Sequence, residues 1–361
     1  MEKREIIALN LVKEINIKDL LFYIENFESI EHISNSKIGK DFNQRFNKSK
    51  LFDFKNEYLD KAEQQISLAE DHDTRIITIK DRDYPKLLSN ISNPPPVLYC
   101  KGKLNSSDEV SISIVGTRKA TNYGRLVVEK FVKQLVENKV IITSGLAYGI
   151  DSYAHDMTIK NNGLTYAVIA SGIDKISTDR SIKLAQKIIE NDGCIISSYP
   201  FGINALPPYF ISRNRIISGI SKATIVVESD TKGGSLWTAK FAVEQNRDLF
   251  AVPGNIFESK SKGTNNLIES NMAIPAINVE QILKHIGFSR INDSNDNKLI
   301  DFKNLEEEKV YNFLSFSPKH IDEIAHGLSM SIMEVQVTLL TLEFNSLVRQ
   351  LPGNQFIRNI N

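Results

Sequence analysis

Cationic side chains recur at one kind of place in this chain, directly after short apolar runs. The cations in these segments are Arg118, Lys119, Lys175, Arg213, Arg215, Lys232 and Lys262. Glycines and hydroxyl side chains stand in the same segments, among them Gly116, Thr117, Gly145, Gly234 and Ser235. Bare backbone N–H groups at helix starts, combined with cations, form anion sites, and several in succession suit a polyphosphate or a nucleic-acid backbone. Anion binding is therefore the chemistry that these residue types predict.

The apolar runs alternate with amphipathic segments between residues 111 and 253. Strand-like runs cover 111–116, 140–145, 164–172, 194–199, 223–228 and 249–253, and helical patterns cover 124–138, 150–160, 181–190 and 235–245. Strands that are apolar throughout and alternate with helices indicate a parallel sheet covered on both faces. We therefore expect a doubly wound α/β domain that extends to about residue 288. Two further cationic segments, at 210–215 and 261–265, are predicted to be loops. Because ligands of such sheets bind beyond the carboxyl ends of the strands, we expect all the cationic segments to meet at that edge of the sheet.

Two signatures of nucleotide binding are missing from this region. No G-x-G-x-x-G follows the first strand, and G-x-x-x-x-G-K-[ST] does not occur in the chain, so neither NAD binding nor ATP hydrolysis is expected. The two cysteines, Cys100 and Cys194, are too few for a zinc site or a disulfide framework and are typical of a reducing cytosol. No cofactor and no metal are predicted. Since no run approaches about 18 apolar residues, no membrane span is predicted either.

Two smaller regions flank the α/β domain. Residues 1–75 show apolar positions at helical spacing, with a polar loop predicted at 43–50, and a proline-rich extended connector follows at 84–99. A polar linker is predicted at 289–304, between the main domain at 76–288 and a last domain at 305–361. The last domain shows helical patterns at 305–316, 320–325 and 332–344 and a β-hairpin around Pro352-Gly353-Asn354, which together are typical of a winged helix.

The charge of the chain is balanced overall but unevenly distributed. Its 44 Lys and Arg residues equal its 44 Asp and Glu residues, which argues against a polybasic protein but not against a local basic face. Residues 305–361 contain seven acidic and four basic side chains, and the candidate recognition helix at 331–344 has neither Lys nor Arg. Entry into a DNA groove needs charges that neutralise phosphates. A duplex-binding regulator is therefore disfavoured, and a protein-contact or accessory role is expected for this domain.

Five ordered segments of the chain resemble the family of DNA-processing protein A, also called DprA or Smf. They are GTR at 116–118, SGLAYGID at 144–151 followed by Ala154-His155, RNRIIS at 213–218, GSLWTA at 234–239 and VPG at 252–254. The entry segment at 84–102 is similar as well, so the resemblance covers about residues 80–285. It implies an extended Rossmann-like domain with a mostly parallel sheet, preceded by a module similar to a sterile-alpha-motif or helix-hairpin-helix domain.

The resemblance also implies a function. It implies that the chain is a cytoplasmic homodimer and a binding protein, not an enzyme. The expected function is to protect incoming single-stranded DNA and to help load the recombinase RecA for recombination in natural transformation. The residues expected to bind DNA are Gly116, Thr117, Arg118, Lys175, Phe210, Arg213, Asn214, Arg215, Lys232, Gly234, Ser235 and Lys262. Arg118, Arg213 and Arg215 are expected to contact phosphates, Phe210 or Tyr209 can stack on a base, and the glycines let the backbone approach.

The chain departs from the family pattern at three places. Tyr148 stands where the family often has Arg, and no Tyr-Pro follows Asp174. The segment at 12–17 lacks the hairpin glycines, so DNA contact by the N-terminal module is not expected.

The second functional hypothesis is a nucleotide-processing hydrolase of related fold. Such an enzyme needs a P-G-G-x-G-T loop, and the hypothesis is weakened because the Pro and the Thr of that loop are missing around Gly233.

Several single residues admit a structural explanation beside a functional one. Asp151 and His155 lie four residues apart and are either an acid–base pair or residues that brace a helix start, and we favour the second. Each arginine of the RNRIIS segment either binds phosphate or forms an ion pair with an acidic neighbour such as Glu228. Trp237 is expected to pack in the core rather than to stack on a base.

Overall fold

The computed structural model describes residues 1–36, 51–104, 109–288, 302 and 304–359. The larger of its two sheets has nine strands. Its order is β1-β2-β6-β5-β4-β3-β7-β8-β9. The strands are β1 (Thr74–Thr78), β2 (Val97–Gly102), β3 (Ser111–Val115), β4 (Ile141–Ser144), β5 (Thr165–Val168), β6 (Cys194–Ser197), β7 (Ala223–Val226), β8 (Asp248–Ala251) and β9 (Ile274–Pro275). Neighbours from β6 to β9 pair in parallel, whereas β2 pairs antiparallel with both β1 and β6.

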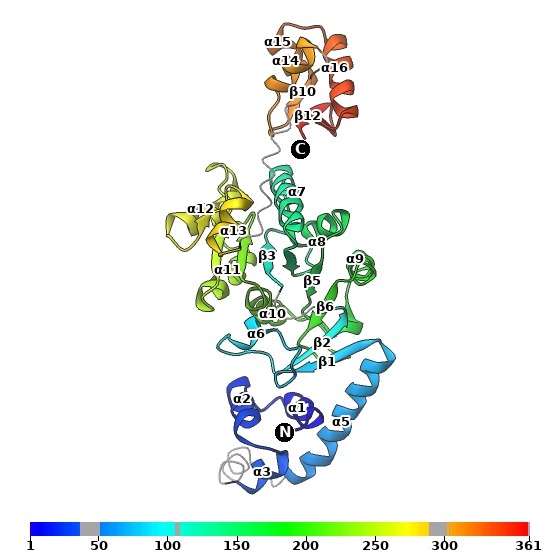
Figure 1. Ribbon diagram of the computed structural model, residues 1–361, viewed down its shortest axis with the longest axis vertical. Helices are drawn as coiled ribbons and strands as arrows, with labels where there is room; N and C mark the ends of the chain where they lie inside the picture. The colour runs from blue at the N-terminus through cyan, green and yellow to red at the C-terminus, as the bar shows by residue number, and fades with distance from the viewer. Residues whose placement is uncertain (37–50, 105–108, 289–301, 303, 360–361) are drawn as a thin grey trace. The chain divides into compact units, whose positions relative to one another are not determined.

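The direction in which the sheet is built reverses at β3. The chain runs from β3 through β4 and β5 to β6, then returns to place β7 on the other side of β3, where Val115 pairs with Val226. The helices of this part are α7 (Asn122–Glu137), α8 (Ile150–Lys160), α9 (Asp179–Glu190), α10 (Pro207–Ile220), α11 (Ser235–Glu244), α12 (Ser259–Glu269) and α13 (Val279–His285). Both α8 and α10 contact β3, β4 and β5, but α8 packs beside α9 and α10 beside α11, so helices cover both faces (Figure 1). The predicted doubly wound sheet is confirmed.

Most of the predicted elements are present, and two predicted loops are helices. The central strands are buried along their whole length, which explains their continuous apolar runs, and α8 has the predicted bounds. The prediction of a loop at 210–215 is wrong because α10 begins at Pro207, and the two prolines of its first turn favour a helix start rather than prevent one. The prediction of a loop at 261–265 is wrong because α12 covers this segment.

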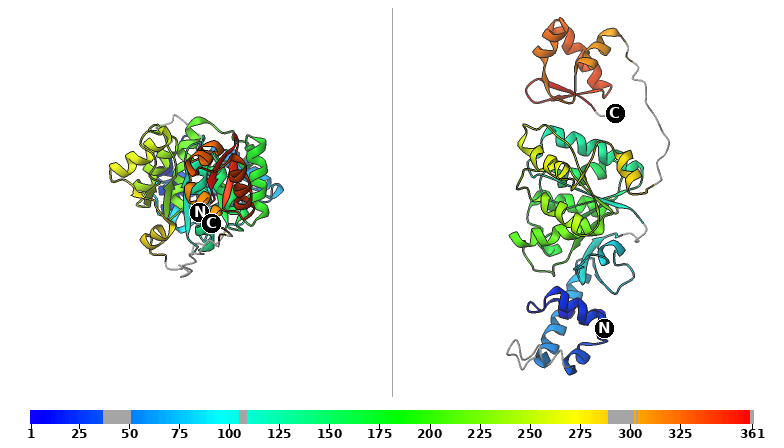
Figure 2. Two further views of the ribbon diagram at one scale, coloured as in Figure 1. Left: turned by 90° about the horizontal axis from the view of Figure 1, so that it is seen from above. Right: turned by 90° about the vertical axis from the view of Figure 1, so that its left-hand side faces the viewer.

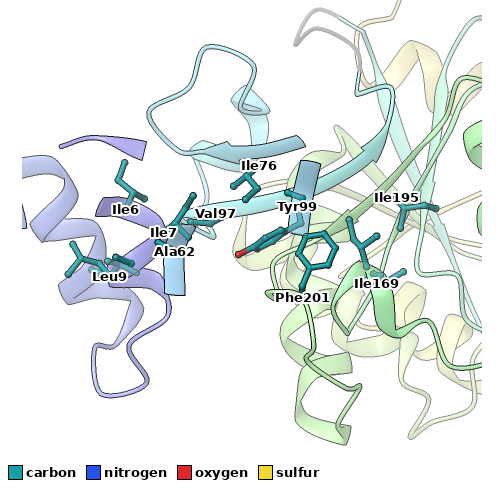
Figure 3. Packing of buried hydrophobic residues seen from close by; sticks show 14 of the residues in the cluster. Ile6, Ile7, Leu9, Ala62, Ile76, Val97, Tyr99, Ile169, Ile195 and Phe201 are labelled. Carbon is teal, nitrogen blue, oxygen red and sulfur yellow. The ribbon is translucent and has the colours of Figure 1, made fainter. Parts of the chain in front are cut away.

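The N-terminal helices share a hydrophobic core with the sheet. They are α1 (Lys3–Asn10), α2 (Ile17–Asn26), α3 (Ile30–Asn35) and α5 (Leu51–Asp71), and Figures 1 and 2 show α1 and α5 beside the strands β1 and β2. One cluster of buried side chains runs from Ile6 and Ile7 through Tyr99 to Ile195 (Figure 3). Within it, the rings of Tyr99 and Phe201 meet edge to face with centroids 5.7 Å apart. The short helices α6 (Lys86–Ser89) and η1 (Ile173–Lys175) complete this part.

The chain divides into two compact units, residues 1–120 with 131–290 and residues 121–130 with 291–361. The predicted boundary between residues 75 and 76 falls inside the first unit and within strand β1. The predicted loop at 43–50 and almost all of the linker predicted at 289–304 lie outside the described residues.

The C-terminal part of the second unit is a winged helix, as predicted. Its elements are α14 (Leu305–Phe313), β10 (Lys319–His320), α15 (Ile321–Leu328), α16 (Ile332–Phe344), β11 (Val348–Leu351) and β12 (Gln355–Arg358), with strand order β10-β12-β11. One face of α16 packs Val335, Leu339 and Leu342 into the core of this domain. The opposite face exposes apolar side chains at Met333, Val337, Leu340 and Phe344.

Candidate nucleic-acid interface

The loops that follow β3, β4 and β7 interlock at the carboxyl edge of the sheet. The amide of Thr117 donates to the carbonyl of Glu228 at 2.8 Å, and the amide of Ile150 donates to the carbonyl of Thr117 at 3.1 Å. Gly149 makes this approach possible, because its φ is +95° and a Cβ atom there would lie 2.3 Å from the Thr117 carbonyl oxygen. The loop after β3 is thereby fixed between the start of α8 and the end of β7.

The side chain of Arg213, on α10, connects the carboxyl ends of β4 and β5. Its side chain is only 4% exposed, and its guanidinium donates to the Gly145 carbonyl at 2.5 Å and to the Val168 carbonyl. Burial lowers the pKa of Arg213 to about 10, although the charge of Asp151 opposes this effect. Arg213 therefore holds the ends of β4 and β5 against α10, and its predicted contact with phosphate stays a prediction.

Asp151 and His155 brace the same loops. The Asp151 carboxylate accepts a hydrogen bond from the Gly145 amide at 3.1 Å, and burial raises its pKa to about 6 against the charge of Arg213. His155 is fully buried with Nδ1 2.6 Å from the Thr165 hydroxyl, and burial lowers its pKa to about 3, so the ring is neutral. These contacts support the structural interpretation of the pair.

A cavity of about 420 Å³ opens between the ends of β3 and β7. This is the point where the strand order reverses, which is where doubly wound sheets bind ligands. Its lining includes the predicted residues Gly116, Thr117, Arg118, Phe210, Arg213, Asn214, Lys232, Gly234 and Ser235. The structure thus brings together most of the residues that the sequence singled out.

The accessible cations of this cavity are Arg118 and Lys232. Both side chains are exposed, and neither forms an ion pair with another described residue. The guanidinium of Arg118 lies over the half-buried ring of Phe210. Asn214 Nδ2 donates to the Gly234 carbonyl at 3.3 Å, which holds the loop before α11 next to α10. Gly234 and Ser235, at the start of α11, therefore line the same cavity, and a helix start favours an anion.

Three predicted residues do not line this cavity. Lys175 forms an ion pair with Asp174 at 3.4 Å, and Lys262 is exposed on α12. Arg215 is half-buried, and burial lowers its pKa against the opposing effect of Tyr84 and Tyr199. The predicted contacts of these three residues with DNA stay predictions, and they would have to be made outside this cavity.

Other residues are placed where the sequence analysis did not expect them. Lys260 lines the cavity in an ion pair with Asp230 at 3.6 Å, and it lies just before the segment 261–265 to which the prediction was limited. The prediction that Trp237 packs in the core is wrong, since its side chain is 42% exposed and Lys240 Nζ lies 5.5 Å from the centre of its ring.

The described residues contain no helix long and apolar enough to cross a membrane, and no cluster of three or more metal-binding side chains.

The fold and the site define a class of protein, in which a Rossmann-like sheet with a cationic cavity at its strand-reversal point is joined to a winged helix. The family model described as DNA recombination-mediator protein A matches residues 75–287, and that of the DprA winged helix domain matches residues 303–354. The chain belongs to the DprA family, also called Smf.

Relatives with known names support this assignment. The chain is 32% identical to Protein Smf of Synechocystis over 79% of this chain and 80% of the relative, and 40% identical to DNA processing protein DprA of Streptococcus pneumoniae over 53% and 67%. The X-ray structure of the S. pneumoniae protein superposes with a TM-score of 0.67 at 31% identity, covering 79% of this chain and 98% of that one. DNA processing protein A from Helicobacter pylori, described for its single-stranded DNA binding mode, gives a TM-score of 0.53 at 28% identity, covering 59% and 95%.

Proposed function

We propose that the chain binds single-stranded DNA at the cavity between β3 and β7 and acts as a recombination mediator. The observation that carries the proposal is the meeting of Arg118 and Lys232, two exposed cations, with the half-buried ring of Phe210. A cation beside an aromatic ring binds a phosphate and stacks the neighbouring base at once. A base in a duplex has its faces covered, so this arrangement favours a single strand.

Each part of the site then has a separate task. Arg118 and Lys232 contact phosphates, and Phe210 stacks on a base. Gly116, Gly234 and Ser235 let the strand approach the backbone amides. Arg213 acts as a positioning residue, because its guanidinium is used by the carbonyls of Gly145 and Val168.

The hydrolase hypothesis would need a carboxylate free to move a proton. Asp151 is the buried carboxylate of the cavity lining, and its pKa of about 6 would suit a general acid or base. Its charged form, however, accepts hydrogen bonds from the backbone amides of Gly145, at 3.1 Å, and of Gly116. These bonds commit the carboxylate to the loops, which favours the binding function.

An electrophoretic shift assay tests the proposal directly. Labelled single-stranded and duplex oligonucleotides of the same sequence are titrated with the full chain, and nucleotide hydrolysis is measured beside them. We expect a shift of the single strand at lower protein concentration than the duplex, and no product from nucleoside monophosphates. Equal affinity for both oligonucleotides, or hydrolysis that Asp151→Asn abolishes, would contradict the proposal.

We further propose that the chain acts as a homodimer and helps RecA to load on the bound strand, in line with its family. This is tested by sedimentation of the full chain and by RecA ATPase activity on single strands coated with a single-strand-binding protein. We expect a dimer and a shorter lag before ATPase activity. A monomer, or an unchanged lag, would overturn the corresponding part.

A further inference from the structure

The strand β1 ends the nine-stranded sheet on one side, and the residues Thr74–Ile77 of this strand line a cavity of about 470 Å³. The other walls of the cavity come from α5, from Lys3 at the start of α1 and from the turn that follows β1. An edge strand presents backbone N–H and C=O groups that no neighbouring strand pairs. None of the residues of this cavity lines the cavity between β3 and β7, so the two sites are separate.

The pairing of β1 with β2 determines which backbone groups face outward. The amide of Ile79 donates to the carbonyl of Pro96 at 2.9 Å, one register position beyond the last pair of the two strands. Bonded and non-bonded positions alternate along an antiparallel pair. The backbone groups of Thr74, Ile76 and Thr78 therefore point away from β2, toward the outer edge of the sheet.

Only part of this outer edge is used within the chain. The amide of Thr78 donates to Asp81 Oδ2 at 2.7 Å, and its carbonyl accepts from the Asp81 amide at 2.9 Å. Lys3 Nζ donates to the Ile76 carbonyl at 2.8 Å, which leaves that oxygen a second lone pair. The amide of Ile76 and the backbone amide and carbonyl of Thr74 have no partner among the described residues. Two successive outward positions, Ile76 and Thr74, can thus pair with an added strand.

The cavity has a charge of opposite sign at each end of β1. Glu70, in the last turn of α5, comes shortly before the strand, and Arg82 comes shortly after it. Both side chains are exposed, and neither forms an ion pair with another described residue, whereas Lys3 and Arg75 of the same lining are paired with aspartates. The edge therefore offers one anion and one cation to a ligand that lies along β1.

We propose that this edge binds an extended peptide segment of a partner protein, which adds to β1 as an antiparallel strand. The residue opposite Ile76 exchanges two backbone hydrogen bonds with it and is aliphatic, because Ile66 and Ile76 give the cavity apolar surface. An acidic residue two positions earlier in the peptide meets Arg82, and a basic residue two positions later meets Glu70. The partner segment is thus defined by main-chain pairing and by the order of its charges.

Fluorescence anisotropy of the full chain with labelled peptides tests the proposal. The probe is Gly-Ser-Glu-Thr-Val-Thr-Lys-Ser-Gly, in which Val is the residue opposite Ile76. We expect the same peptide with Glu and Lys exchanged to bind about threefold more weakly or worse. A probe with N-methylated Val lacks the N–H that donates to the Ile76 carbonyl and should bind about fivefold more weakly or worse. Hydrogen exchange of the Ile76 amide should slow when the first probe binds.

A pair of charge variants completes the test. Glu70→Lys with Arg82→Glu should reverse the preference between the two charge orders. Lys18→Glu with Glu25→Lys makes the same changes of charge on α2, outside the cavity, and should leave the preference as in wild type. All four side chains are exposed, so both double variants are expected to fold, which urea unfolding verifies.

Three outcomes would overturn the proposal. The first is equal binding, or no binding, of the two charge orders by the wild-type chain. The second is full affinity for the N-methylated probe, because main-chain pairing cannot then hold the peptide. The third is a dimer in sedimentation that Glu70→Lys with Arg82→Glu dissociates, because a second copy of the chain then covers the edge. The peptides are tested without DNA, so none of these results decides whether the chain binds single strands.

Discussion

The guanidinium carbon of Arg118 lies 5.6 Å from the centre of the Phe210 ring. The cation comes from the loop after β3 and the ring from α10, so the pair joins elements that are far apart in the sequence. Stacking restricts the Arg118 side chain before any ligand arrives, and a restricted side chain loses less entropy when it binds a phosphate. Both side chains line the cavity between β3 and β7, which makes the pair the centre of the proposed interface.

Arg118→Ala is expected to weaken binding of single-stranded DNA and to reduce its salt dependence. Loss of one phosphate contact lowers the slope of log affinity against log salt by about 0.7 for a single strand. Anisotropy titrations at several salt concentrations measure both effects. Lys119→Ala is the matched control, because Lys119 is exposed on the same loop but does not line the cavity between β3 and β7. A slope that is the same in wild type and Arg118→Ala would remove Arg118 from the interface.

Arg213→Lys is expected to reduce the free energy of unfolding by about 2 kcal/mol or more, because a lysine lacks the planar guanidinium whose Nη1 reaches both carbonyls and whose Nε donates to Asn214, while its charge stays buried. Urea unfolding measures this change. Arg118→Lys changes an exposed guanidinium in the same way and should leave the free energy of unfolding within about 0.5 kcal/mol of wild type. Were Arg213→Lys as stable as wild type but unable to bind DNA, Arg213 would be a direct ligand of phosphate instead of a positioning residue.

Gly149→Ala is expected to destabilise the chain more than Gly202→Ala. Both glycines have positive φ, at +95° and +86°, and this alone costs an alanine roughly 1–3 kcal/mol. Only at Gly149 would the new Cβ also meet backbone, 2.3 Å from the Thr117 carbonyl oxygen, while at Gly202 nothing lies within 4 Å. Thermal unfolding of the two variants compares them. Equal destabilisation would mean that the loop after β3 shifts freely.

His155 should make the chain sensitive to acid. Its pKa is lowered to about 3 from the ordinary 6.5, so between these values the unfolded chain binds a proton that the native chain does not. Stability contributed by neutral His155 is therefore complete above about pH 6.5 and is lost as pH falls, by about 1.4 kcal/mol per pH unit. Asp151, with its pKa raised from 3.8 to about 6, acts in the opposite direction within part of this window.

The comparison with His155→Asn isolates the histidine, because Asp151 is present in both proteins. We expect the difference in free energy of unfolding between wild type and His155→Asn to shrink as pH falls from 6.5 to 4. Urea unfolding at several pH values measures it. A difference that is constant with pH would show that His155 takes up a proton over the same pH range in the native and the unfolded chain, so that its pKa is not lowered.

The winged helix is expected to gain duplex affinity when its exposed face is made basic. α16 carries Glu334 and Glu343 but no Lys or Arg, so we expect weak duplex binding by this domain, caused by charge and not by shape. Met333→Lys with Val337→Lys places two cations on the exposed face and should steepen the salt slope of duplex binding by up to about 2. Single-strand affinity serves as the internal control and should not change. An unaltered duplex slope would argue that this face does not reach DNA.

The alternation of strands and helices was predictable because each central strand is buried on both faces. Apolar runs of this kind separate clearly from amphipathic helices such as α8, whose two ends were placed correctly. α10 was not predictable in the same way, since its prolines and cations resemble a loop. The prolines stand in its first turn, where no backbone N–H is needed.

The site was predictable in its location but not in the orientation of its side chains. Arg213 and Arg215 are two residues apart on α10, yet only Arg213 lines the cavity, because residues two apart face different sides of a helix. The partners of Arg213 lie 68 and 45 residues away in the sequence, at Gly145 and Val168, so no local pattern reveals its burial.

The core that α1 and α5 share with the edge of the sheet also governs how the molecule comes apart. Because Ile6 and Ile7 belong to the same cluster as Tyr99 and Ile195, the N-terminal helices cannot separate without exposing the apolar side of β2 (Figure 3). Loss of these helices and loss of the β1–β2 strand pair are then one cooperative event. A chain cut between α5 and β1 would carry an uncovered apolar strand pair, which favours aggregation. The N-terminal helices thus keep the apolar side of β1 and β2 away from solvent and protect the folding unit from aggregation.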